Sequence, residues 1–202
     1  MDLFNIEMSF FKKLFNTPKP QEPLESNLEF QNLPIDQIFV KNFIKNKGKF
    51  LYCTTLEEVT LNLSNIIKEN SWKTMSCNDY DLLKLMKAIK VETTEELNKT
   101  TPFFLSCEHL IAENGSILFS SNQLKEHKIA ELPENFIVYA TTSQLVNTKG
   151  ESLTGIKSHY QGNIPSNISA VNNFNTEAIE EDFMSYGNTN SKNLYLLLFE
   201  DL

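Results

Sequence analysis

Cysteine, glycine and basic residues are the scarce components of this 202-residue sequence. Its three cysteines, Cys53, Cys77 and Cys107, are an odd and widely spaced set, which excludes an iron–sulfur or zinc motif built on closely spaced cysteine pairs. We therefore expect reduced thiols in or near the core of a cytoplasmic protein. The six glycines form no phosphate-binding cluster, neither a P-loop nor a G-x-G-x-x-G dinucleotide turn.

The charge balance and the lack of a long apolar run exclude two further classes of protein. Eighteen basic residues stand against 26 acidic ones, for a net charge of −8, whereas a nucleic-acid-binding surface needs positive charge. No stretch approaches the roughly 18 to 20 apolar residues that a membrane span requires. The first residues also lack the pattern of a secretory signal. We expect no nucleic-acid partner, no metal site and no resident cofactor.

The sequence divides into an N-terminal extension, residues 1–32, and a domain, residues 33–202. Met1–Phe15 has the apolar spacing of a short amphipathic helix, and Asn16–Ser26 is a linker that contains three prolines. Two lysines make a weak electrostatic anchor, so we expect a flexible arm or a docked helix rather than membrane contact.

Helical and strand patterns alternate along the domain, which predicts an α/β fold with a mainly parallel sheet. Apolar periodicity and capping residues predict helices over Ile35–Lys45, a segment opening at Thr54–Thr55, a segment capped by Asn78 or Asp79, Thr142–Val146, Glu151–Tyr160 and Thr176–Tyr186. Short apolar runs predict strands at Phe50–Cys53, Trp72–Cys77, Phe103–Ser106, Ser116–Ser120, Phe136–Tyr139, Asn167–Val171 and Leu194–Phe199.

The most informative short segment is His109–Ser120, HLIAENGSILFS. Asn114-Gly115 favours the positive φ angles of a tight turn, so one interpretation is a β-hairpin with Glu113 at its tip. The alternative is functional. A carboxylate at a strand end, beside free backbone amides, can act as a nucleophile or general base, and Glu108 and His109 lie close enough in sequence to tune it.

This segment resembles the IAETG-like stretch of the LUD (lactate utilization C-like) family, here Ile111-Ala112-Glu113-Asn114-Gly115. The family's later GPSRTADIE-like stretch is matched by Asn172–Glu180, which keeps only Thr176, Ile179 and Glu180, and only Gly187 remains of its GVHGP-like loop. The resemblance, over about residues 36–200, implies Glu113 as the catalytic candidate. The ligand-binding candidates that accompany it are Asn114, Gly115, Ser116, His109, Thr176 and Glu180.

The resemblance also implies a three-layer α/β/α fold similar to the sugar-phosphate isomerase and CoA-transferase superfamily, with helices on both faces of the sheet. It implies a non-redox accessory or regulatory component of lactate or organic-acid metabolism, with iron–sulfur lactate-utilization subunits as partners. The alternative is an enzyme that acts through Glu113 on an anionic small molecule such as an acyl-CoA or a sugar phosphate. Family I CoA-transferases carry their glutamate in a Ser-Glu-Asn-Gly turn, which Ala112–Gly115 resembles.

Overall fold

The computed structural model describes residues 33–174 and 191–201. The N-terminal extension, the predicted helix Thr176–Tyr186 and the candidates Thr176 and Glu180 lie outside the described residues. No helix within the described part of the chain is long and apolar enough to cross a membrane.

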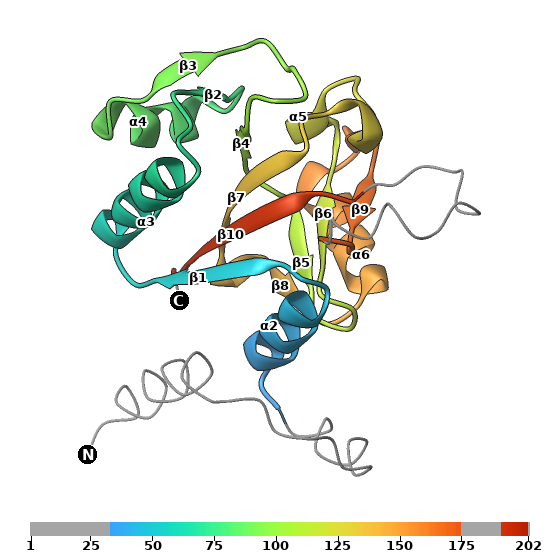
Figure 1. The fold of residues 1–202 in the computed structure, drawn as a ribbon. Helices are drawn as coiled ribbons and strands as arrows, with labels where there is room; N and C mark the ends of the chain where they lie inside the picture. Colours follow the sequence, from blue (N-terminus) through green and yellow to red (C-terminus); the bar gives the residue numbers. More distant parts are fainter. Residues whose placement is uncertain (1–32, 175–190, 202) are drawn as a thin grey trace, which may run out of the picture. The chain divides into compact units, whose positions relative to one another are not determined.

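Six parallel strands form the central sheet (Figure 1). In spatial order they are β1 (Lys49–Cys53), β10 (Asn193–Phe199), β7 (Asn135–Thr141), β4 (Phe103–Leu105), β2 (Thr74–Ser76) and β3 (Glu92–Thr94). The inner strands β10, β7 and β4 are apolar at most positions because both faces of a parallel sheet are covered. Strands β10 and β7, for example, pair in parallel with Leu196 next to Val138.

Neighbouring residues of β7 point to opposite faces of the sheet and identify what covers each face. Ile137 packs into a core with Val59, Leu63 and Met86, which come from helices α3 (Leu56–Glu69) and α4 (Tyr80–Ala88). Phe136 instead lies against Phe119, with ring centroids 6.0 Å apart. One face is therefore covered by α3 and α4, and the other by the segment that contains Phe119.

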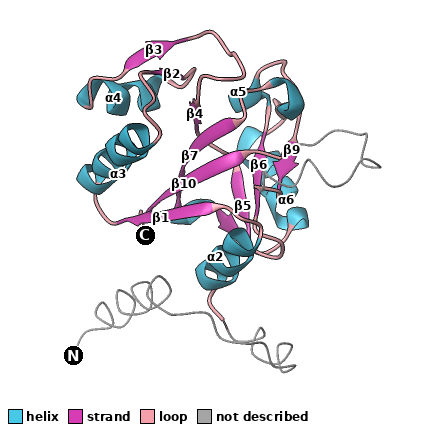
Figure 2. Cartoon of the chain, in the orientation of Figure 1, coloured by secondary structure: helices cyan, strands magenta, loops and turns pink. Residues whose placement is uncertain are grey.

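That second face carries a four-stranded sheet in the order β8 (Leu145–Val146), β5 (His109–Ile111), β6 (Ser116–Phe119) and β9 (Ser169–Val171). Strands β5, β6 and β9 of this sheet are labelled in Figure 2. Its outer side packs on helix α6 (Lys149–Tyr160) through Ile111, Leu118 and Ile156. Helix α2 (Ile35–Lys45) contacts β1 and β8. The predicted α/β architecture, a mainly parallel sheet with helices on both faces, is confirmed, and the second sheet is an addition that the sequence did not indicate.

Local signals explain where several helices begin. Thr55 Oγ1 accepts a hydrogen bond from Glu58 N, and Glu58 Oε2 accepts one from Thr54 N at 2.7 Å, so α3 starts at the predicted threonine pair. These hydrogen bonds, above all the one from the Thr54 backbone, lower the pKa of Glu58. Helix α2 has the predicted bounds, and Asp79 rather than Asn78 caps α4.

The predicted helix Thr142–Val146 is wrong. Thr142–Gln144 is one 3-10 turn (η3), and Leu145 and Val146 form β8, which pairs with Leu110 and Ile111 of β5. Five residues hold too few hydrogen bonds to sustain an isolated helix, and the neighbouring β5 edge offers partners to the same backbone groups. Three further elements were not predicted: β3, helix α5 (Ser121–Leu124) and the 3-10 turn η2 (Ile129–Glu131).

Candidate functional site

The segment singled out in the sequence forms the predicted β-hairpin, with β5 and β6 antiparallel and Ala112–Gly115 as its turn. The Glu113 side chain is exposed, and its Oε1 accepts a hydrogen bond of 2.9 Å from Lys149 N in the first turn of α6. A carboxylate is favourable there because the first backbone N–H groups of a helix lack intrahelical partners. The structure thus places Glu113 as a contact between the hairpin tip and α6.

The hairpin tip also docks on helix α2. Asn42 Nδ2 donates to Ala112 O at 2.8 Å, and the Nδ2 of Asn46 donates to Asn114 O at 2.7 Å. Gly115 has φ +66°, and a Cβ there would lie 2.5 Å from backbone atoms of Asn42 and Phe43. Two features therefore require glycine at this position: the left-handed backbone and the close approach of α2.

Two other sequence candidates lie along the same hairpin. His109 is half-buried, and its Nδ1 lies 3.4 Å from Gln144 O. Ser116 is buried, and its Oγ has no hydrogen-bond partner among the described residues. The described sequence candidates thus all lie on this hairpin, with Glu113, Asn114 and Gly115 in its turn, Ser116 directly after it and His109 at the other end of β5.

A polar cavity lies elsewhere, where the parallel strands β2 and β4 end. Its volume is about 210 Å³, and it is lined by Asn78, Asp79, Phe103, Phe104, Leu105, Ser106, Asn122, Gln123 and Lys125. From β2 the chain runs through α4 to β3 on one side, whereas from β4 it runs to the hairpin and β7 on the other. Such a reversal between neighbouring parallel strands opens a crevice at their carboxyl ends, where open α/β sheets bind ligands. We name it the switch-point cavity.

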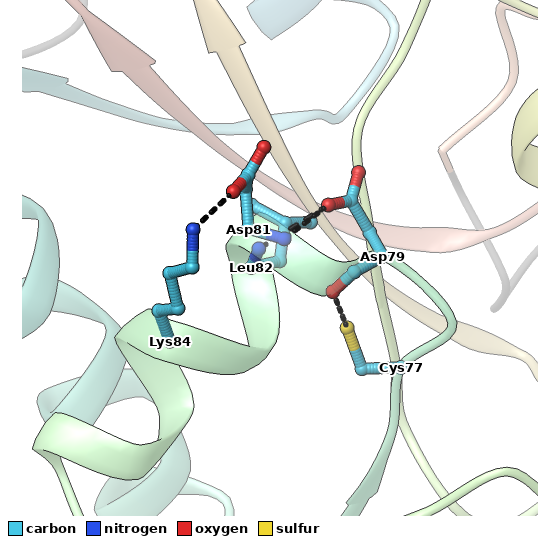
Figure 3. A network of polar contacts seen from close by, with 5 residues as sticks. All are labelled: Cys77, Asp79, Asp81, Leu82 and Lys84. Carbon is cyan, nitrogen blue, oxygen red and sulfur yellow. Dashed lines mark hydrogen bonds and ion pairs between the residues drawn. The ribbon is translucent and has the colours of Figure 1, made fainter.

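Asp79 is fixed at the first turn of α4 (Figure 3). Its Oδ1 accepts hydrogen bonds from Asp81 N at 2.9 Å and from Leu82 N at 3.2 Å, and the Cys77 thiol contacts its carbonyl oxygen. Its other oxygen, Oδ2, accepts a bond of 2.9 Å from Ser106 Oγ. The cap and the serine hold the carboxylate in one orientation at the cavity wall.

A second carboxylate, Glu108, lies outside the lining and binds the side-chain amides of two residues that line the cavity. Glu108 Oε1 accepts hydrogen bonds from Ser120 Oγ at 2.5 Å, from Asn122 Nδ2 at 3.1 Å and from Gln123 Nε2 at 3.2 Å. Tyr160 OH donates to Glu108 Oε2 at 3.1 Å. Burial, and then the negative charge of Glu108, raise the pKa of Tyr160, so this hydroxyl stays a donor at neutral pH. Glu108 therefore positions two cavity-lining amides.

Lys125 supplies the positive charge of the cavity lining. It ends α5 with φ 55° and ψ −124°, a backbone conformation that side chains other than glycine rarely adopt. Its side chain is exposed, and Nζ donates to Asn122 O at 2.8 Å. Strained backbone of this kind gathers at functional sites, where the surrounding structure maintains it.

The sequence and the fold are both similar to those of known proteins. A family model described as the LUD domain matches residues 36–199. The chain belongs to the LUD domain family. The crystal structure of a DUF162-family protein from Deinococcus radiodurans is similar to this LUD domain, with a TM-score of 0.56 and 11% sequence identity, over 83% of this chain and 99% of that one. At that identity the likeness shows the fold. No curated protein matches the chain.

The residues of the switch-point cavity were not predicted as a site from the sequence of this LUD domain. Asn78 and Asp79 were named as helix caps, and Ser106 as the end of a strand. The missed signal is that these polar residues directly follow apolar strands, because carboxyl ends of parallel strands meet at one edge of a sheet. Lys125 directly follows the short helix α5, which has too few residues for a periodic pattern. Within the described part of the chain, no cluster of three or more histidine, cysteine or acidic residues could hold a metal ion.

Proposed function

We propose that this LUD domain is a non-redox accessory component of organic-acid metabolism, similar to the C component of the lactate-utilization system. The observation that carries the proposal is the match of residues 36–199 to the LUD domain, and the number of cysteines supports the non-redox part of it. The full sequence has only three, whereas a cysteine-held iron–sulfur cluster takes four thiolates. Electrons taken from L-lactate would then pass through iron–sulfur partner subunits, which we propose as the binding partners.

The environment of the cysteines supports this role. All three thiols are free and buried. Burial raises the pKa of each, to about 11 for Cys77 and further still for Cys107. Because the thiolate is the form that binds metal and reacts, these groups are poor ligands and poor nucleophiles. Free thiols also suit the cytoplasm, where we propose that the protein acts.

Affinity purification from the native host tests the proposal, together with growth of a deletion strain on L-lactate. We expect iron–sulfur subunits in the purified material and a growth defect that the intact gene restores. Recovery of the protein without such a partner, together with normal growth of the deletion strain, would refute the accessory role.

A second candidate function is an enzyme that acts through Glu113 on an acyl-CoA, a sugar phosphate or a similar anionic metabolite. The observation in its favour is that Glu113 is exposed and lies beside backbone N–H groups at the start of α6. Under this proposal Glu113→Gln abolishes turnover in the folded protein, and hydroxylamine traps a glutamyl thioester. If calorimetry detects no binding of CoA, an acyl-CoA is excluded as the substrate of such an enzyme.

A further inference from the structure

We propose that the switch-point cavity binds a small organic anion that carries more than one hydroxyl group. Lys125 takes the anionic group, and Asp79, Ser106 and Asn122 accept hydrogen bonds from the hydroxyls. This ligand class deepens the proposed role in organic-acid metabolism and rests on it for its biological setting, but its argument comes from the hydrogen-bonding capacity and size of the cavity.

Three fixed side chains of the lining, Asp79, Ser106 and Asn122, leave hydrogen-bond acceptors unused. Ser106 donates its one hydroxyl hydrogen to Asp79 Oδ2, so the Ser106 oxygen remains able to accept a hydrogen bond. Asn122 donates its amide hydrogens to Glu108 and to Tyr160 OH, the latter at 2.8 Å. No described residue donates to Asn122 Oδ1, and Asp79 Oδ2 receives only the Ser106 hydroxyl. Three acceptors on one lining favour a ligand with several donors.

The acceptors are fixed before a ligand arrives. The α4 backbone holds Asp79, and Glu108 holds Asn122 through its amide nitrogen, which turns the opposite, carbonyl end of that amide away from Glu108. Preorganised acceptors lose little freedom on binding, and they stay unpaired when an analogue lacks the matching hydroxyl. The arrangement therefore selects for hydroxyls rather than merely tolerating them.

Lys125 determines the charge of the ligand. Among the described residues, Asn122 O alone takes one of its three ammonium hydrogens, so two remain for a carboxylate or phosphate. Its backbone is held in the left-handed region at the edge of the cavity. Such a conformation persists only where the surrounding structure maintains it, and the Nζ bond to Asn122 O links the ammonium group to a residue that supplies one of the acceptors.

The size of the cavity limits the ligand. A volume of 210 Å³ corresponds to about seven water molecules at roughly 30 Å³ each. It is smaller than the roughly 300 to 1,000 Å³ of pockets that hold drug-sized ligands, so it favours a small acid. Acids such as glycerate and tartrate match both the volume and the acceptors.

Isothermal titration of the full-length protein with matched acids tests the proposal. D-glycerate is compared with propionate, and L-tartrate with succinate, since each pair differs only in hydroxyls. We expect the hydroxylated member to bind at least tenfold more tightly. Lys125→Met should weaken that binding at least tenfold, whereas Lys128→Met, at an exposed lysine outside the cavity, should not. Ser106→Ala should reduce the difference in affinity between the hydroxylated and the unhydroxylated acid of each pair.

A measurement on the unaltered protein keeps the test independent of how the variants fold. In nitrogen–proton NMR spectra, tartrate should shift the side-chain amide signals of Asn122 and Gln123 and leave those of Asn42 and Asn46 unchanged. Equal affinity within each pair, or no binding of any of the four acids, would overturn the proposal. Binding of the hydroxy acids without an iron–sulfur partner or a growth defect would instead remove the accessory role and leave the cavity assignment standing.

Discussion

Gly115→Ala is the substitution for which the structure gives the clearest magnitude. An alanine at φ +66° carries the left-handed backbone cost of about 1–2 kcal/mol. Its Cβ would lie 2.5 Å from the backbone of α2, so the hairpin tip must move away from that helix. This movement breaks the hydrogen bonds from Asn42 and Asn46 to the tip, each of which contributes about 1 kcal/mol. The free energy of unfolding should fall by roughly 3–4 kcal/mol.

Thermal and urea denaturation measure this loss. For a domain of this size, each 1 kcal/mol lowers Tm by roughly 2–4 °C, so Gly115→Ala should melt roughly 6–16 °C below the wild type. Gly150→Ala is the matched control. Its Cβ would meet only Thr148 Oγ1, at 3.7 Å, and alanine favours the helix by up to about 1 kcal/mol. A Gly115→Ala protein within about 1 kcal/mol of the wild type would refute the packing argument.

Three further predictions concern charged residues. Partial burial raises the pKa of Asp201, but hydrogen bonds from Ser143 and Thr142 outweigh it and bring the pKa to about 2; this carboxylate should stabilise the fold above about pH 4 and lose that effect as the pH falls toward 2. Asp201→Asn should therefore flatten the acid limb of a Tm-against-pH curve, and an unchanged limb would contradict the assignment. Glu113→Ala should lower the free energy of unfolding by about 1 kcal/mol and Glu113→Gln by less, since glutamine keeps an acceptor for α6; equal losses in urea titrations would argue against the cap. Lys125→Gly should raise Tm by roughly 2–4 °C, because relief of about 1–3 kcal/mol of backbone strain exceeds the entropic cost of glycine, whereas Lys125→Ala should not; a lower Tm for the glycine variant would show that the backbone is unstrained.

The elements that the sequence predicts well are those whose signals are local. Helix α2 has a complete apolar stripe, and the Thr54–Thr55 pair with Glu58 fixes the start of α3 through bonds within four residues. The Asn114-Gly115 turn encodes its own backbone geometry. By contrast, β3 is an edge strand with exposed polar residues, and β8 exists only because β5 lies beside it. No short window of sequence contains the partner that makes such strands.

The site was harder to predict than the fold for a related reason. The hairpin residues are adjacent in sequence and were found together, whereas the walls of the switch-point cavity come from three separate segments. Asp79 and Ser106 are 27 positions apart and meet only because β2 and β4 are neighbours in the sheet. Strand order depends on tertiary packing, so sequence periodicity alone does not reveal which strand ends meet.

The hairpin and the cavity are nevertheless connected through helix α6. Glu113, after β5, binds the backbone at the start of α6, and Glu108, before β5, accepts a hydrogen bond from Tyr160 at its end. Two carboxylates that flank one strand thus hold both ends of a 12-residue helix. Glu108 also holds Asn122, so the geometry of the cavity wall depends on the position of this hairpin and helix. The IAENG segment is therefore linked to the cavity through α6, from Glu113 at the start of the helix to Tyr160 and Glu108 at its end.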